Sequence, residues 1–309
     1  MNQITQFINQ SQKLLIIVAE IPFNDVQIIK RFLIKCHCSM IIEPLSQLRT
    51  DLDLQLKIVS EMSIHITDFT HVLRIGGIPV TSLWRQLANY SSIQTLSISH
   101  LPFNGLTHGQ LINDDYHLLM GSCQQSLPDL NGRQKLADTF PQHSNSEAEM
   151  IHQLSCDIPS DSRIYLGNSS PIRMWANYAT YENSLFQIYA SRGVNGIDGQ
   201  ISTFLGICGQ KSENWGIFGD LTALYDLSSL WILPQLRQLT IRIVIIHNYG
   251  GQIFAKKFPK FPDLINQHTI EFDYWAKLWG IQITTITDMT TFNHFCWDQH
   301  HIIILKPQK

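Results

Sequence analysis

The stretch that decides the fold, Gly219 to Phe254, reads GDLTALYDLSSLWILPQLRQLTIRIVIIHNYGGQIF. A short apolar run ends at Gly219-Asp220, helix-like leucine spacing follows, and a β-branched run leads into His247-Asn248. The order strand, helix, strand predicts a parallel crossover, which returns the chain to the same edge of a sheet. We therefore expect Asp220 and Asn248 side by side at the carboxyl edge, where open α/β sheets bind their ligands.

The residue types at this edge suit a metal ion and a phosphate group. A carboxylate, an amide oxygen and a nearby loop carbonyl are hard oxygen ligands of the kind that Mg2+ prefers. The helix after Asp220 begins with free backbone N–H groups, which can face a diphosphate. The structural alternative is that Asp220 caps a helix and Asn248 makes a turn, and these residues alone leave both interpretations open.

Composition limits the classes of protein to consider. The chain has 309 residues, 44% of them hydrophobic, which is enough for two domains with separate cores. The formal net charge is −3 and no long basic stretch is present, so we expect neither a nucleic-acid nor a membrane partner.

The start of the chain has no signal-peptide pattern, and Cys36-His37-Cys38 lacks a second pair at zinc-finger spacing. We expect a cytoplasmic protein with structural cysteines.

Alternating strand and helix patterns along both halves predict an α/β protein with two doubly wound parallel-sheet domains. We expect a Rossmann-like domain at 1–120, a connection rich in Gly, Ser and Asn at 121–145, and a second domain at 146–309. In the first domain, Asn24 and Gln27 predict a capping box at the start of a helix. Strands are expected there at 13–20, 40–42, 71–75 and 93–98.

In the second domain, polar residues follow three predicted strands. Strands are expected at 163–166, 185–190, 215–218, 240–246, 281–285 and 302–305. A helical pattern extends from Leu224 to Pro234. Asn168-Ser169 with Arg173 and the glycine-rich loop of Arg192 follow two of the strands. Two arginines at one edge favour an acidic substrate, because guanidinium groups pair with carboxylates; the alternative is a solvated face or a structural ion pair.

Four motifs, in this order and spacing, resemble those of the MenD family: GNSSPIR at 167–173, SRGVNGIDGQIST at 191–203, GDLTALYDLSSL at 219–230 and HNYGGQIF at 247–254. These are thiamine-diphosphate enzymes of menaquinone biosynthesis, which add the decarboxylated succinyl unit of 2-oxoglutarate to isochorismate. The resemblance implies that the first domain is similar to the family's central domain and the second to its diphosphate-binding domain.

The resemblance also implies roles for individual residues. The implied Mg2+ ligands are Asp220, Asn248 and the backbone oxygen of Gly250. The other implied contacts to thiamine diphosphate are Ile197, Gly219, Leu221 and Thr222. The implied contacts to the dicarboxylate substrates are Ser169, Arg173, Arg192, Ile253 and Phe254. The cofactor itself supplies the chemistry of decarboxylation and carbon–carbon bond formation.

Three departures from the family pattern shape the functional alternatives. His247 stands where the family usually has Asn, with a mild expected effect, and Lys256-Lys257 replace apolar residues. The family's pyrimidine-binding domain, with its catalytic glutamate, has no counterpart in these residues, so no catalytic residue is assigned.

We expect a homo-oligomer or a separate pyrimidine-domain chain as partner. The alternatives are a non-catalytic remnant that binds the cofactor or a protein, and a subunit of a 2-oxo acid decarboxylase.

Overall fold

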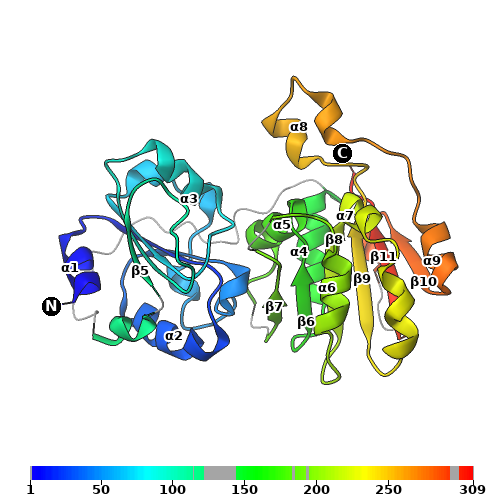
Figure 1. The fold of residues 1–309 in the computed structure, drawn as a ribbon, viewed down its shortest axis with the longest axis horizontal. Helices are drawn as coiled ribbons and strands as arrows, with labels where there is room; N and C mark the ends of the chain where they lie inside the picture. The colour runs from blue at the N-terminus through cyan, green and yellow to red at the C-terminus, as the bar shows by residue number, and fades with distance from the viewer. Residues whose placement is uncertain are drawn as a thin grey trace. The chain divides into compact units, whose positions relative to one another are not determined.

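The computed structural model describes residues 2–113, 115–121, 144–182, 185–192, 195–292 and 299–308. The chain divides into two compact units, Met1–Phe140 with Tyr181–Asn183, and Pro141–Thr180 with Ser184–Lys309. Each unit is built on one parallel sheet, which confirms the predicted fold class (Figure 1). Most of the connection expected at 121–145 lies outside the described residues.

The first unit has a five-stranded parallel sheet in the order β2-β1-β3-β4-β5. Its strands are β1 Leu14–Val18, β2 Ser39–Ile42, β3 His71–Ile75, β4 Gln94–Ser99 and β5 Gln110–Asn113. Its helices are α1 Gln3–Gln10, α2 Val26–Lys35 and α3 Ser82–Gln86. Successive residues of β1 point to opposite faces, so that Ile16 packs in the core with Ile29 of α2, and Ile17 packs in the core with Trp84 of α3. Both faces of the sheet are therefore covered.

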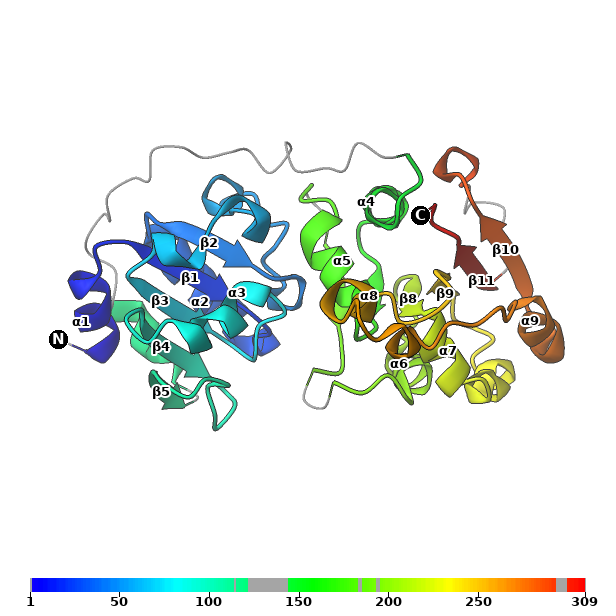
Figure 2. The same ribbon diagram turned by 90° about the horizontal axis from the view of Figure 1, so that it is seen from above.

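The second unit has a six-stranded parallel sheet in the order β10-β11-β9-β8-β6-β7. Its strands are β6 Arg163–Leu166, β7 Gln187–Tyr189, β8 Asn214–Gly219, β9 Ile241–Ile246, β10 Gln282–Ile286 and β11 His300–Leu305. Its helices are α4 Glu147–Asp157, α5 Ser170–Tyr178, α6 Gln200–Ile207, α7 Asp220–Tyr225, α8 Ile253–Lys257 and α9 Asp273–Trp279. Figure 2 shows α4 and α5 on one face of the sheet and α6 and α7 on the other.

The predicted crossover between β8 and β9 is confirmed. The two strands pair in parallel, and Gly219 lies opposite Ile246. All six residues of β9 are buried, as expected for a central strand that is covered on both faces. The register brings the residues that follow each strand, Asp220 and His247, to the same level at the carboxyl edge.

Two local predictions are wrong. Asn24 lies in a 3-10 turn, Phe23–Asp25, and α2 begins at Val26 with no side-chain cap. The helix expected up to Pro234 is broken, because α7 ends at Tyr225 and the chain continues as a 3-10 helix at Ser229–Gln235. Proline has no N–H and its ring clashes with the preceding turn of an α-helix, so an α-helix through this position is disfavoured.

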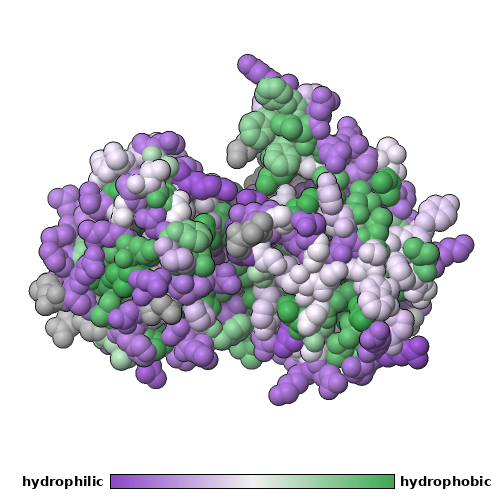
Figure 3. Space-filling model, in the orientation of Figure 1, coloured by the Kyte–Doolittle hydropathy of each residue, from purple (hydrophilic) through white to green (hydrophobic). Residues whose placement is uncertain are grey.

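The segment after β9 forms an arm that carries α8 and a 3-10 helix at Pro262–Ile265. Figure 1 draws this arm above the carboxyl edge of the second sheet. Figure 3 shows apolar surface on this arm. Its exposed apolar side chains are those of Phe254, Phe258, Phe261 and Leu264. Across the described residues, the structure contains no helix of the length and hydrophobicity that crossing a bilayer requires.

Candidate functional site

A pocket of about 380 Å3 lies at the carboxyl edge of the second sheet. It is lined by residues that follow β6, β8 and β9, by the loop before α6, and by α8. Every site residue named from the sequence lines this pocket: Ser169, Arg173, Arg192, Ile197, Gly219, Asp220, Leu221, Thr222, Asn248, Gly250, Ile253 and Phe254. The four motifs therefore converge on one cavity, although they come from different strand ends.

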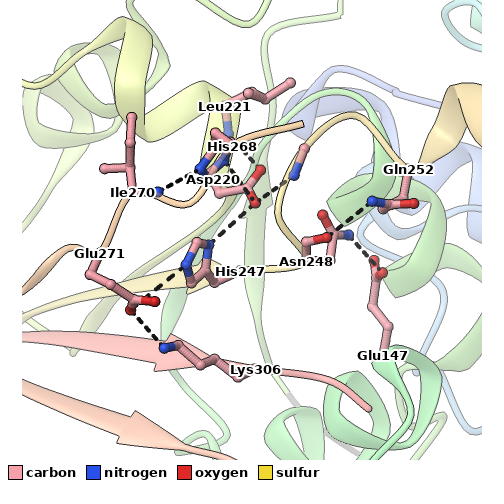
Figure 4. Close-up of polar contacts among 11 residues, drawn as sticks. Glu147, Asp220, Leu221, His247, Asn248, Gln252, His268, Ile270, Glu271 and Lys306 are labelled. Carbon is pink, nitrogen blue, oxygen red and sulfur yellow. Dashed lines mark hydrogen bonds and ion pairs between the residues drawn. The ribbon is translucent and has the colours of Figure 1, made fainter. Parts of the chain in front are cut away.

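Asp220 is buried at the start of α7, and its carboxylate is surrounded by N–H groups (Figure 4). Its Oδ1 accepts the backbone N–H of Leu221 at 2.7 Å. Its Oδ2 accepts the backbone N–H of Gly250 at 3.0 Å, and the rings of His247 and His268 approach the same oxygen at 3.3 Å. These contacts hold the carboxylate plane in one orientation at the pocket wall.

The side chain of Asn248 is oriented by a residue that the sequence did not single out. Its Nδ2 donates to Oε2 of Glu147 at 3.1 Å, and Oε1 of the same glutamate accepts the hydroxyl of Ser170 at 2.6 Å. The backbone carbonyl of Asn248 accepts from Nε2 of Gln252 at 3.1 Å. Since Glu147 engages the amide nitrogen, the amide oxygen of Asn248 is the atom left to serve as a ligand.

The loop at Gly250 requires glycine. Its φ is 131°, and a Cβ there would lie 2.7 Å from the carbonyl oxygen of Ile265. The next residue, Gly251, donates its N–H to that same carbonyl at 2.6 Å, so the arm is bonded to the loop. The carbonyl of Gly250 accepts the N–H of Gln252 at 2.8 Å and keeps a second lone pair.

Arg173 and Arg192 line the pocket, and each also donates a hydrogen bond to a neighbouring residue. Arg192 donates from Nη1 to Oδ1 of Asn168 at 3.0 Å, and Asn168 donates in turn to the carbonyl of Gly196 at 2.8 Å. Arg173 donates from Nη1 to the carbonyl of Ser169, one turn back on its own helix. The sequence left open whether these arginines bind substrate or hold structure. The geometry gives each of them a structural contact within the pocket wall.

Glu271 and Lys306 form an ion pair beside Nε2 of His247. Nε2 of the histidine is 3.9 Å from Oε2 of Glu271, and Nζ of Lys306 is 2.6 Å from the same oxygen. The hydrogen bond from Lys306 holds the pKa of Glu271 below its usual value. A line of polar contacts therefore runs from Asp220 through His247 to the surface (Figure 4).

The donor atoms of the pocket fit the metal that the sequence predicted. Oδ1 of Asp220, the amide oxygen of Asn248 and the carbonyl of Gly250 are hard oxygen ligands, and Mg2+ takes such ligands together with water and phosphate oxygens. The side chains of Lys256 and Lys257, which replace apolar residues of the family, lie outside what the structure describes.

Comparison with solved structures defines the class of fold. The chain resembles a putative thiamin diphosphate-dependent enzyme from Mycobacterium smegmatis, with a TM-score of 0.67 and 15% sequence identity over 99% of this chain and 64% of that chain. The two parallel-sheet units are thus those of the thiamine-diphosphate enzyme fold. No protein-family model matches the chain.

Sequence relatives give the particular family. A 2-succinyl-5-enolpyruvyl-6-hydroxy-3-cyclohexene-1-carboxylate synthase from Bdellovibrio bacteriovorus is 35% identical over 91% of this chain and 56% of its own length. The synthase from Akkermansia muciniphila is 33% identical over 72% of this chain and 45% of its own length. Over the residues that it shares with them, the chain belongs to this synthase family, which confirms the predicted resemblance. The chain spans about half the length of the curated relatives it matches.

Proposed function

We propose that this chain provides the metal- and diphosphate-binding half of a transferase that uses thiamine diphosphate and Mg2+. The reaction adds the decarboxylated succinyl unit of 2-oxoglutarate to isochorismate, a step of menaquinone biosynthesis. The observation that carries the proposal is the convergence of Asp220, Asn248 and Gly250 on one pocket in a chain of this family.

In this proposal the three oxygen ligands hold Mg2+ against the diphosphate. Gly219, Leu221 and Thr222 line the pocket with Asp220 and contact the diphosphate, and Ile197, which also lines the pocket, supports the rest of the cofactor. The bound cofactor supplies the decarboxylation and the carbon–carbon bond formation, whereas the chain binds it and orients it. Equilibrium binding of thiamine diphosphate with and without Mg2+ tests this step, because the proposal requires that binding depends on the metal.

The substrate end of the pocket combines charge with apolar surface. Ser169, Arg173 and Arg192 offer polar groups to the substrate carboxylates, and Ile253 and Phe254 offer apolar contacts. Guanidinium groups suit this role because they form two parallel hydrogen bonds to one carboxylate. The proposed reaction has two acidic substrates, 2-oxoglutarate and isochorismate. The pocket has two arginines, Arg173 and Arg192, to pair with their carboxylates.

Replacing Arg173 by Met is expected to weaken dicarboxylate binding and to spare the cofactor. Methionine keeps much of the apolar stem of the side chain, and the loss of one charged hydrogen bond costs about 1.5–3 kcal/mol, which is roughly 10- to 150-fold in affinity. Calorimetric titration of 2-oxoglutarate into the cofactor-loaded protein measures the effect. The control is Arg237→Met, because Arg237 is exposed and does not line the pocket. A loss of cofactor affinity instead would assign Arg173 to the diphosphate or to the fold.

Turnover requires a carboxyl group that acts on the aminopyrimidine of the cofactor, and we propose that a pyrimidine-binding domain supplies it. The domain acts from a second chain or from another part of an oligomer. We place the reaction in the cytoplasm.

A further inference from the structure

We infer that Glu147 is a positioning residue of the metal site, which fixes the side-chain amide of Asn248 so that its oxygen, and not its nitrogen, is presented to Mg2+. The inference rests on the proposed function, since it concerns the same metal. Oε2 of Glu147 accepts a hydrogen bond from Nδ2 of Asn248 at 3.1 Å (Figure 4). Asn248 lines the pocket and Glu147 does not, so the glutamate acts through Asn248 rather than on the ligand itself.

The two ends of an asparagine amide have nearly the same shape but opposite chemistry. The nitrogen donates hydrogen bonds and the oxygen accepts them, whereas a carboxylate only accepts. Glu147 can therefore bond the nitrogen of Asn248 and not the oxygen. Among the residues that the structure describes, none donates a hydrogen bond to the oxygen of this amide. That oxygen is thus available to Mg2+, which binds oxygen ligands and would be repelled by the N–H groups of a reversed amide.

Glu147 is itself held in one orientation. Its second oxygen, Oε1, accepts the hydroxyl of Ser170, the first residue of α5, at 2.6 Å. Its backbone is the first residue of α4, a helix that Ser146 caps and whose next residue, Ala148, is buried. Since both carboxylate oxygens are bonded and the backbone is anchored, the carboxylate has little freedom to rotate. The orientation of Asn248 therefore follows from the packing of α4 and α5.

Two other roles for Glu147 compete with positioning. Its negative charge near the metal would attract Mg2+ through space, whatever the orientation of the amide. Alternatively, its two hydrogen bonds tie α4 to α5 and to the loop after β9, which is a structural role that does not depend on the metal. The three roles predict different results for substitutions that change the charge of Glu147 and its capacity to accept hydrogen bonds separately.

The test measures the Mg2+ affinity of Glu147→Gln and Glu147→Met by calorimetry in the presence of thiamine diphosphate. Both substitutions remove the charge and keep a side chain of similar length, but only glutamine keeps an acceptor for Asn248, with an amide group that can donate to Ser170. We expect Glu147→Met to lose about 10- to 100-fold in Mg2+ affinity, as is typical when the partner of a metal ligand is removed, and Glu147→Gln to keep most of it. Thermal unfolding shows whether each variant folds, and Glu147→Ala replaces Glu147→Met if methionine disturbs the packing.

The same two substitutions in an Asn248→Asp protein separate positioning from a structural role. The two oxygens of an aspartate are equivalent, so either of them can bind Mg2+ and no partner is needed to select one. The glutamine and methionine variants should therefore differ when residue 248 is Asn and have equal Mg2+ affinity when it is Asp. The control is Asp161→Asn, because Asp161 is an exposed carboxylate of the second unit that lies before β6 and does not line the pocket.

The outcomes separate this inference from the proposed function. If Glu147→Gln and Glu147→Met lose the same Mg2+ affinity, the charge alone matters and positioning is overturned. If Glu147→Met remains weaker than Glu147→Gln in the Asn248→Asp protein, the role is structural and positioning is again overturned. If neither variant loses affinity while wild type binds thiamine diphosphate with Mg2+, the inference is wrong and the proposed function stands. If wild type shows no metal-dependent binding of the cofactor, both fail together.

Discussion

Replacing Asp220 by Ala is expected to abolish Mg2+-dependent binding of thiamine diphosphate. In the proposed function, this substitution removes the charged metal ligand at the pocket wall and leaves the diphosphate without its bridging cation. Loss of one partner from a buried charge pair costs about 3–5 kcal/mol, so affinity should fall by more than roughly 100-fold. Calorimetric titration of thiamine diphosphate in the presence of Mg2+ measures the loss.

Two further variants make the result of Asp220→Ala interpretable. Asp220→Asn keeps the shape of the side chain and removes the charge, which separates a binding defect from a folding defect. Asp273→Ala is the matched control, because Asp273 is an exposed carboxylate in the first turn of α9 and does not line the pocket. Equal affinity in wild type and Asp220→Ala would refute the assignment of the metal ligand.

The chain alone is expected to release no carbon dioxide from 2-oxoglutarate. Among the described residues that line the pocket, Asp220 is the one acidic side chain, and the proposed function assigns it to the metal. The aminopyrimidine of the cofactor therefore meets no second carboxyl group here, and a cofactor fixed at one end is poorly positioned for reaction. Addition of a separately expressed pyrimidine-binding domain from a full-length relative should restore turnover.

A carbon dioxide assay on the mixture distinguishes the functional alternatives. Activity that needs both proteins and disappears with Asp220→Ala supports an enzyme assembled from two parts. Activity of the chain alone would overturn the need for a second carboxyl group. Carbon dioxide release without product formation when isochorismate is present would favour a 2-oxo acid decarboxylase, and cofactor binding without turnover in any mixture would favour a non-catalytic binding protein.

The strand pattern predicted that Asp220 and Asn248 meet at one edge of the sheet, whereas the resemblance to the family supplied Ile197, Ile253 and Phe254. The β-branched run before His247 and the apolar run before Asp220 are strong strand signals, and the crossover rule makes their ends neighbours. Glu147 and His268 could not be found in this way. Glu147 lies 101 positions from Asn248, its hydrogen-bond partner, and His268 reaches Asp220 from an arm with no regular pattern. Their contacts depend on tertiary packing.

The broken helix after Asp220 shows the limit of periodicity. Leucines three positions apart lie on one face of an α-helix, but residues three positions apart also lie on one face of a 3-10 helix. This spacing therefore does not distinguish the two helix types. Leu230 and Leu233 are both buried in the 3-10 segment, so the apolar face was predicted correctly although the helix type was wrong. The break follows Tyr225, nine positions before Pro234, where the carboxylate of Asp226 accepts the backbone N–H and the hydroxyl of Ser202, a tertiary contact that periodicity does not reveal.

Titration of thiamine diphosphate into the wild-type chain, once with Mg2+ and once with excess EDTA, tests the central claim most directly. In the proposed function, the oxygen atoms of Asp220, Asn248 and Gly250 hold the cofactor through the metal. The account therefore predicts saturable binding with Mg2+ and none with EDTA. Equal binding in both titrations, or no binding in either, would contradict it.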